Sequence, residues 1–226
     1  MAAAVIKPIN IVITADSICP FCYLGFTKIH KAIATAKARQ LPLQFNLRFA
    51  PYQLDPTLPS DKAISKRERY AAKFGAARFD QMEKMMAQRF ADEGLSITYD
   101  GTVRQTTLSH RLIARAYEVG GEAMQMKTVE GIYRKYFSEG KDIGDVEVLV
   151  TVAVERGVFG TEEAAREWLK GSEGMKEYEA GVLAAQKAGI SGVPFFRIND
   201  KWGISGAQDP ELFVKVFERI SNGDIA

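Results

Sequence analysis

Asp16-Ser17-Ile18-Cys19-Pro20-Phe21-Cys22-Tyr23-Leu24-Gly25 holds both cysteines of the 226-residue chain, spaced as Cys-x-x-Cys. Residues 9–14, which are rich in β-branched side chains, precede this stretch and predict a buried strand. Residues 26–38 follow it with a helical pattern. The cysteines therefore lie where a strand turns into a helix. Pro20 fits the first helical position, because its fixed φ suits a helix start and its missing N–H needs no partner there.

This placement predicts different roles for the two cysteines. Cys19 falls at the helix cap and Cys22 in the first turn. The start of a helix carries unpaired N–H groups and partial positive charge, which stabilise a thiolate. We therefore expect the pKa of Cys19 to lie below that of a free cysteine. Cys22 is close enough to attack a mixed disulfide at Cys19, so we interpret Cys19 as the nucleophile and Cys22 as the resolving thiol.

Two other interpretations of the Cys-x-x-Cys are open. The cysteines could be small buried hydrophobic residues without a chemical role. They could also form half of a zinc site. Zinc needs further ligands, and the chain offers only His30 and His110 and no second cysteine pair. The strand, the proline and the helix together favour a redox pair, so we predict no metal.

The bulk composition indicates a protein with a substantial core. The chain is 46% hydrophobic with a net charge of +2, so a nucleic-acid or anionic-membrane partner is not expected. No segment is long and apolar enough for a membrane span, and the first residues lack a secretory pattern. We therefore expect a cytoplasmic protein, in which a lone cysteine pair is more often catalytic than structural.

A second strand and, much later in the chain, a hairpin are also predicted. Leu43, Phe45, Leu47 and Phe49 alternate with polar residues, a period-two pattern typical of a strand. With the first strand and helix this makes a βαβ unit, which favours a parallel pair. Residues 193–198 and 201–206 predict a hairpin around a turn at 199–200, and a final helix starts near 209.

The chain between residues 60 and 171 has an almost wholly helical pattern. Gly120 and Gly121 interrupt it, and Asp145 and Thr161 are predicted to cap two shorter helices. A short extended piece at residues 95–101 is expected at the surface. The prediction is an α/β protein with a thioredoxin-like fold and a large helical insertion. The thioredoxin-like part comprises residues 1–59 and 172–226, and residues 60–171 are the insertion.

Pro194 is predicted to lie at the start of the strand that follows the insertion, where a proline is tolerated. In a thioredoxin-like sheet this position comes back beside Cys19. We therefore hypothesise a cis Val193–Pro194 bond, which places the Val193 backbone next to the cysteines, ready to pair with an incoming peptide. The alternative is an ordinary trans proline at a strand start.

Several stretches carry a family resemblance. They are Cys19-Pro20-Phe21-Cys22-Tyr23-Leu24-Gly25, Gly192-Val193-Pro194-Phe195-Phe196, Pro51-Tyr52-Gln53-Leu54-Asp55-Pro56, Leu108-Ser109-His110-Arg111-Leu112-Ile113 and Tyr136-Phe137-Ser138-Glu139-Gly140-Lys141-Asp142-Ile143. Through them the chain resembles the DsbA-like thioredoxin superfamily over nearly its whole length. More closely, it is similar to the FrnE-type dithiol–disulfide oxidoreductases.

The resemblance implies a thioredoxin fold whose helical insertion covers the active site. It implies Cys19 as nucleophile, Cys22 as resolving cysteine, and Val193-Pro194 as a cis-proline loop. The superfamily also holds kappa-class glutathione transferases and 2-hydroxychromene-2-carboxylate isomerases, which typically carry serine at the position of Cys19 and lack the second cysteine. Retention of both cysteines favours redox exchange. Phe21 stands where bacterial DsbA has histidine, which argues against strong oxidising power.

Three polar residues near the motif need separate interpretations. Asp16, three residues before Cys19, is either a proton acceptor for Cys22 or a cap for nearby backbone N–H groups. His30 lies two turns along the helix from Cys22, too far to pair with the thiols. His110 begins a helix of the insertion, where we expect capping or packing.

The predicted function is thiol–disulfide exchange through the Cys19-Pro20-Phe21-Cys22 pair, with no metal or organic cofactor. The expected partners are protein or small-molecule thiols and disulfides, with glutathione a candidate co-substrate through the resemblance. The expected assembly is a monomer or a homodimer. One alternative is a glutathione-dependent transferase or isomerase acting on a small hydrophobic substrate. Another is a non-catalytic binding or chaperone module.

Overall fold

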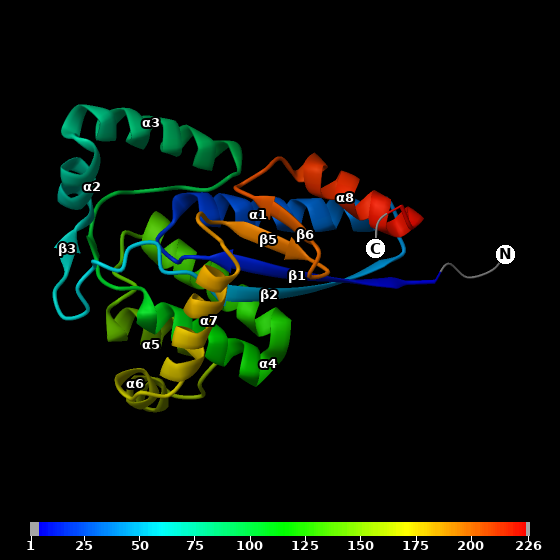
Figure 1. Cartoon of the computed structure of the whole chain (residues 1–226). Coiled ribbons are helices and arrows are strands. Elements are labelled where there is room, and N and C mark those ends of the chain that lie inside the picture. Colours follow the sequence, from blue (N-terminus) through cyan, green and yellow to red (C-terminus); the bar gives the residue numbers. More distant parts are fainter. Residues whose placement is uncertain (1–4, 225–226) are drawn as a thin grey trace.

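The computed structural model describes residues 5–224 and is built around a four-stranded mixed sheet (Figure 1). The sheet order is β2-β1-β5-β6. Strand β1 is parallel to β2 and antiparallel to β5, and β5 is antiparallel to β6. The strands are β1 (Lys7–Ala15), β2 (Leu43–Pro51), β5 (Phe195–Ile198) and β6 (Trp202–Ser205). The parallel β1–β2 pair confirms the βαβ unit predicted from the sequence.

Helices cover both faces of this sheet. Helices α1 (Pro20–Ala38) and α8 (Pro210–Asn222) pack together on one face. Helices α4 (Thr107–Tyr133) and α7 (Met175–Lys187) lie on the other face and contact β2. This mixed sheet with helices on both faces agrees with the α/β fold and additional helices predicted from the sequence.

The remaining elements extend the structure beyond the sheet. Near the end of the sheet where α1 begins lie β3 (Ile64–Ser65), α2 (Lys66–Phe74), α3 (Ala76–Asp92) and β4 (Thr102–Val103). A π-helical turn at Arg134–Ser138 continues α4 and leads to α5 (Val146–Glu155) and α6 (Glu162–Lys170). One hydrophobic core runs through the sheet and into these helices. The division of the chain at residues 60 and 171 stays a prediction.

Side chains of α4 protect the edge strand β2. The amide of Gln125 accepts a hydrogen bond from the Phe49 N–H at 2.8 Å and donates to its carbonyl at 3.3 Å. Glu122 accepts from the Leu47 N–H at 2.9 Å. An exposed strand edge invites pairing with other chains, and these contacts satisfy its backbone groups instead. They also fix α4, the helix that carries His110, against the sheet.

Local sequence signals set the ends of several elements. Asp145 and Thr161 cap α5 and α6 through side-chain hydrogen bonds to backbone N–H groups, as predicted. Helix α4 is kinked at Gly120–Gly121, where the backbone is not helical. The β5–β6 turn has φ of 49° at Asn199 and 56° at Asp200, the positive values that a tight hairpin turn requires. Within residues 5–224, no helix combines the length and apolar character needed to span a bilayer.

Two details of the predicted fold are wrong. The segment at residues 95–101 was expected at the surface, but Tyr99 within it is buried, with 5% of its surface exposed. The short strand forms afterwards, at Thr102–Val103, where it pairs with Ile64–Ser65. Strand β5 begins at Phe195, so Val193 and Pro194 lie in the loop before it. In both cases the strand forms only where a segment distant in the sequence pairs with it: Ile64–Ser65 for β4, and β1 for β5.

We predict that Gly25→Ala destabilises the protein. Alanine at a helical position normally gains about 1 kcal/mol over glycine. Here a Cβ would lie 2.7 Å from Cγ of Pro194 and 3.2 Å from Cζ of Phe196. Overpacking of this kind costs about 1–3 kcal/mol. We therefore expect a lower free energy of unfolding in urea, by about 1 kcal/mol after the helical gain is subtracted.

Gly160→Ala is the matched control, because no atom lies within 4 Å of its added Cβ. We expect its effect to stay within about 0.5 kcal/mol. A Gly25→Ala variant at least as stable as the natural chain would show that the Pro194 loop moves away freely.

Candidate active site

The two cysteines occupy the start of α1 as the sequence predicts. Cys19 is the N-cap residue, with extended φ and ψ of −87° and 115°, and Pro20 opens the helix. The Cys19 carbonyl accepts hydrogen bonds from the N–H groups of Cys22 at 3.0 Å and Tyr23 at 3.3 Å. Both cysteines are free thiols. Cys19 is 4% exposed and Cys22 is fully buried, so Cys19 is the thiol nearer to solvent.

The loop before β5 lies against Cys19. The Cys19 thiol donates a long hydrogen bond of 3.7 Å to the carbonyl oxygen of Val193. The Val193–Pro194 peptide bond is cis, in agreement with the sequence hypothesis. Thr14 pairs with Phe195 in the antiparallel β1–β5 ladder, and this register brings the loop to the start of α1.

The environment of Cys22 favours its protonated form. Burial is the main cause that raises the pKa of this thiol well above its usual value, followed by its hydrogen bond with Cys19. The charges of Cys19 and Asp16 raise the pKa further, and a backbone hydrogen bond from Asp16 partly offsets them. Cys22 therefore needs a proton acceptor before it can act as a nucleophile.

Asp16 is a fully buried carboxyl group directly after β1. Its Oδ1 accepts a hydrogen bond from the Ile18 N–H at 3.3 Å, and its Oδ2 accepts from the Leu54 N–H at 2.6 Å. Asp16 thus caps backbone groups around the Cys-x-x-Cys loop, one of the two roles considered from the sequence. Nε2 of His110 lies 3.4 Å from Oδ1 of the same carboxyl group. Sequence analysis gave no indication of this contact.

A cavity of about 280 Å³ opens beside Cys19. Its walls come from the start of α1, the Val193 loop, helices α2 and α3, and the segment before β4. Most of the lining is apolar or aromatic, and the side chains that cover it include Tyr70, Phe74, Met82, Met86 and Tyr99. A ligand thiol could therefore reach Cys19 with an apolar substituent enclosed by the cavity.

Three charged residues border this cavity. Arg69 forms an ion pair with Asp55, and Nζ of Lys73 lies 3.9 Å from the same carboxylate. Arg69 and Lys73 carry two positive charges against the single carboxylate of Asp55, so this rim has a net positive charge, which favours an anionic ligand.

Phe21 is also part of the cavity lining, and the Arg89 guanidinium lies 5.5 Å from the centre of its ring.

A buried lysine lies behind the cavity wall. Lys66 is 1% exposed, and its ammonium donates a hydrogen bond of 2.7 Å to the Tyr136 carbonyl. The same nitrogen lies 3.9 Å from the centre of the Tyr136 ring, which faces the cavity. Burial lowers the pKa of Lys66 to about 8, although Asp142 and Asp100 act in the opposite direction.

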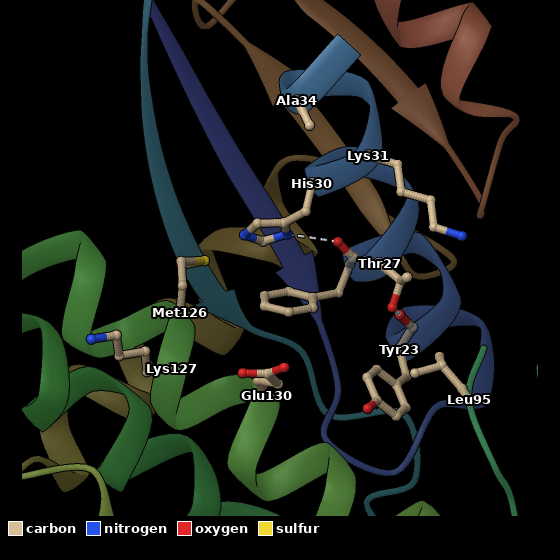
Figure 2. A pocket seen from close by; sticks show the side chains of 10 residues that line it. Tyr23, Thr27, His30, Lys31, Ala34, Leu95, Met126, Lys127 and Glu130 are labelled. Atoms are coloured by element: carbon tan, nitrogen blue, oxygen red, sulfur yellow. Dashed lines mark hydrogen bonds between the residues drawn. The ribbon is translucent and has the colours of Figure 1, made fainter. Parts of the chain in front are cut away.

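A second hollow, of about 500 Å³, runs along α1 next to α4 and contains neither cysteine (Figure 2). Tyr23, His30 and Glu130 border it, and Nδ1 of His30 donates a hydrogen bond of 2.8 Å to the Phe26 carbonyl. His30 therefore has a local partner on its own helix.

The structure brings all the predicted site residues to one end of the sheet. Cys19, Cys22, Val193 and Pro194 meet there, with Asp16 beneath them. Pro20 and Phe21 line the cavity. The residues that sequence analysis missed are Tyr70, Tyr99, Lys66 and the His110–Asp16 contact. No spacing pattern connects them with the cysteines. Among residues 5–224, no group of three histidine, cysteine or acidic side chains could hold a metal ion.

A sheet with a Cys-x-x-Cys helix start and a proline loop beside it defines a thioredoxin-type protein. A family model described as a DSBA-like thioredoxin domain matches residues 10–218, and the chain belongs to this family. The family relation supports oxidoreductase or isomerase chemistry of the DsbA-like kind.

Several known proteins are similar to this chain. The crystal structure of a probable DsbA oxidoreductase from Streptomyces coelicolor is 27% identical with a TM-score of 0.82, covering 96% of this chain and 92% of that one. The uncharacterized Bacillus subtilis (strain 168) protein YwbO is 25% identical over 212 residues, which are 92% of this chain and 94% of that protein.

Two more distant structures share the fold. The cytosolic disulfide reductase DsbM from Pseudomonas aeruginosa, solved with GSH, has a TM-score of 0.59 at 15% identity, covering 95% of this chain and 98% of that one. A 2-hydroxychromene-2-carboxylate isomerase has a TM-score of 0.65, also at 15% identity, covering 96% and 99%. One fold thus serves a disulfide reductase and an isomerase, so the site residues must decide the chemistry.

The buried ammonium of Lys66 predicts a specific pH dependence of stability. Above about pH 8 the folded chain loses this proton, whereas the unfolded chain keeps it up to its ordinary pKa of 10.5. The unfolded state then binds more protons, so stability rises with pH across this range. We expect the natural chain to gain about 1–3 kcal/mol relative to Lys66→Met between these two pKa values.

Chemical unfolding at several pH values measures this difference. Lys84→Met is the control, because Lys84 is an exposed lysine on α3. Its stability should run parallel to that of the natural chain. A constant difference between the natural chain and Lys66→Met would contradict the lowered pKa of Lys66.

Proposed function

We propose that this protein is a thiol–disulfide oxidoreductase that works through Cys19 and Cys22. One observation carries the proposal. The more accessible thiol belongs to the N-cap residue of α1 and contacts the Val193 carbonyl, while the second thiol lies one turn further along, fully buried. A nucleophile at a helix start next to a protected resolving thiol is the arrangement that disulfide exchange needs.

The proposed reaction has two steps. The Cys19 thiolate attacks a substrate disulfide, forms a mixed disulfide, and releases one substrate sulfur as a thiolate. Cys22 then gives its proton to Asp16 and attacks Sγ of Cys19. The Cys19–Cys22 bond forms, and the second substrate sulfur leaves with the electron pair and takes a proton from solvent. The reverse sequence oxidises a substrate dithiol.

The surroundings of Cys19 support a role for each supporting residue. The partial positive charge at the start of α1 stabilises the Cys19 thiolate, and Pro20 opens that helix without losing a hydrogen bond. The Val193–Pro194 loop offers its backbone to an extended substrate beside the thiol. Phe21 adds apolar surface to the cavity for the substrate.

The proposed substrates are small-molecule or extended peptide thiols and disulfides, with glutathione as co-substrate or recycling partner. The positive rim of the cavity suits the carboxylates of such a tripeptide. The proposed cellular site is the cytoplasm, where such thiols keep a cysteine pair in exchange. No metal or organic cofactor takes part in the proposed reaction.

A second candidate function is a glutathione-dependent transferase or isomerase. The observation in its favour is the apolar cavity of about 280 Å³ beside Cys19, which is suited to a small hydrophobic substrate. Such an activity would not need Cys22. It therefore survives Cys22→Ser, whereas disulfide exchange stops at the mixed disulfide.

We predict opposite trapping behaviour for the two cysteine variants. Cys22→Ser leaves the nucleophile without a resolving thiol, so mixed disulfides accumulate at Cys19 after incubation with oxidised glutathione. Cys19→Ser leaves only a buried thiol whose pKa is raised, so it traps almost nothing. Mass spectrometry of the intact protein measures the adducts. The reverse pattern would overturn the assignment of the nucleophile.

We also predict a two-thiol redox transition of the natural chain. After equilibration in glutathione buffers, alkylation should count both thiols free or both lost, with no stable single adduct. Cys22→Ser is the control, and it should show only the adduct. A lasting glutathione adduct on the natural chain would favour the transferase or isomerase function instead.

A further inference from the structure

His110 is a buried titratable side chain without a hydrogen-bond partner. The residue is 3% exposed, and neither ring nitrogen makes a hydrogen bond within residues 5–224. Its ring lies between two aromatic rings, with centroids 6.2 Å from Phe49 and 5.8 Å from Tyr178. An unpaired buried polar group costs about 1–3 kcal/mol, so its presence calls for an explanation.

The polar group nearest to this ring is the carboxyl group of Asp16. Nε2 of His110 lies 3.4 Å from Oδ1 of Asp16, and both side chains are 1% exposed. The contact lacks the alignment of a hydrogen bond, but a small movement of either side chain would complete one. The Asp16 carboxyl group accepts two hydrogen bonds, from the backbone N–H groups of Ile18 and Leu54, which hold it in place.

A second contact fixes the first turn of α4 against the cysteine loop. Oγ of Ser109 donates a hydrogen bond of 2.9 Å to Oγ of Ser17, and both serines are fully buried. Ser17 follows Asp16, and Ser109 precedes His110. The helix start that carries His110 is thus joined directly to the loop that carries Asp16 and Cys19.

Cys22 needs the acceptor that this pair provides. The thiol is fully buried, so bulk water cannot take its proton directly. Apart from Cys19, Asp16 is the charged group that acts on it, both through its charge and through its backbone. A carboxylate that receives this proton at neutral pH does so more readily when a second base can share the proton.

We propose that His110 is a positioning residue for the resolving step: its unpaired Nε2 shares with Asp16 the proton that Asp16 accepts from Cys22. This inference rests on the proposed disulfide exchange. When Cys22 attacks, its proton goes to the Asp16–His110 pair. The Cys19–Cys22 bond forms, the bond from Cys19 to the substrate sulfur breaks, and the substrate leaves as a thiolate. The pair then releases this one proton to solvent.

The other titratable groups around the pair stay neutral near pH 7. They are the phenols Tyr178 of α7, Tyr133 of α4, Tyr136 of the π-helical turn and Tyr70 of α2. Burial is the main cause that raises the pKa of each one, and the charge of Asp16 contributes in all four. A phenol with a raised pKa already carries its proton near pH 7, so none of the four can accept the proton of Cys22.

The test separates the two chemical steps with an aromatic disulfide, 5,5′-dithiobis(2-nitrobenzoate). Attack by Cys19 releases one coloured thiolate, and resolution by Cys22 releases the second. Stopped-flow absorbance across pH 5–8, the range in which histidine titrates, records both rates. In the natural chain, the second rate should show an inflection that depends on His110, whatever the pH dependence of the first rate.

His110→Gln keeps a donor at the position of Nε2 but cannot titrate. We expect the second release to slow by about tenfold at neutral pH and to lose its inflection. The first release should keep its rate, both in this variant and in combination with Cys22→Ser. His110→Asn, whose amide is too short to reach Asp16, should show the same loss and serves if the glutamine variant does not fold.

Two further variants sharpen the result. His30→Gln is the matched control, because it removes the other histidine, which lies on the hollow without cysteines (Figure 2). It should leave both rates unchanged. Asp16→Asn should slow the second release by itself, and adding His110→Gln should slow it little further, because the two residues act as one unit.

The outcomes separate this inference from the proposed function. If His110→Gln slows both releases equally, the histidine has only a structural role, and the inference is overturned. The inference is also overturned if His110→Gln leaves the rate of the second release unchanged. It is overturned as well if the second release of the natural chain shows no inflection between pH 5 and 8. If the natural chain shows no second release at all, disulfide exchange itself fails. That last result contradicts the proposed function before His110 is considered.

Discussion

The antiparallel pairing of β1 with β5 is the constraint on which the rest of the site depends. It places Val193 next to Cys19, although the two residues are 174 positions apart in the chain. The approach is tight, because the Pro194 ring lies where a Cβ of Gly25 would be. The start of α1, the end of β1 and the loop before β5 thus form one packed unit. The proposed chemistry at Cys19 depends on this packed unit.

Burial makes two neighbouring cysteines chemically different. Cys19 lies at the helix cap beside a cavity, whereas Cys22 has no exposed surface and a raised pKa. The same low-polarity environment holds Asp16, so charge near the thiols is costly and has to be compensated. Backbone N–H groups of the cysteine loop and of the segment after β2 compensate it. The packing that buries Cys22 therefore also keeps its thiol protonated.

The helices added to the sheet decide how a substrate can approach. Helices α2 and α3 and the segment before β4 cover Cys19 with aromatic and methionine side chains, and leave a positively charged rim. The cavity of about 280 Å³ that remains beside Cys19 is the basis for proposing small or extended substrates. The chain belongs to the DSBA-like thioredoxin domain family, and a 2-hydroxychromene-2-carboxylate isomerase shares its fold, so the fold alone does not decide the reaction.

The sequence alone determined the strand–helix junction, the cap position of Cys19 and the thioredoxin-like order of elements. These follow from local rules, because strand periodicity, a proline at a helix start and capping residues act over a few positions. Tertiary structure decided what those rules cannot reach. Tyr99 is buried at the cavity although its segment was expected at the surface, and His110 meets Asp16 although 94 positions separate them. Both contacts depend on how distant helices pack on the sheet, and no local pattern encodes that packing.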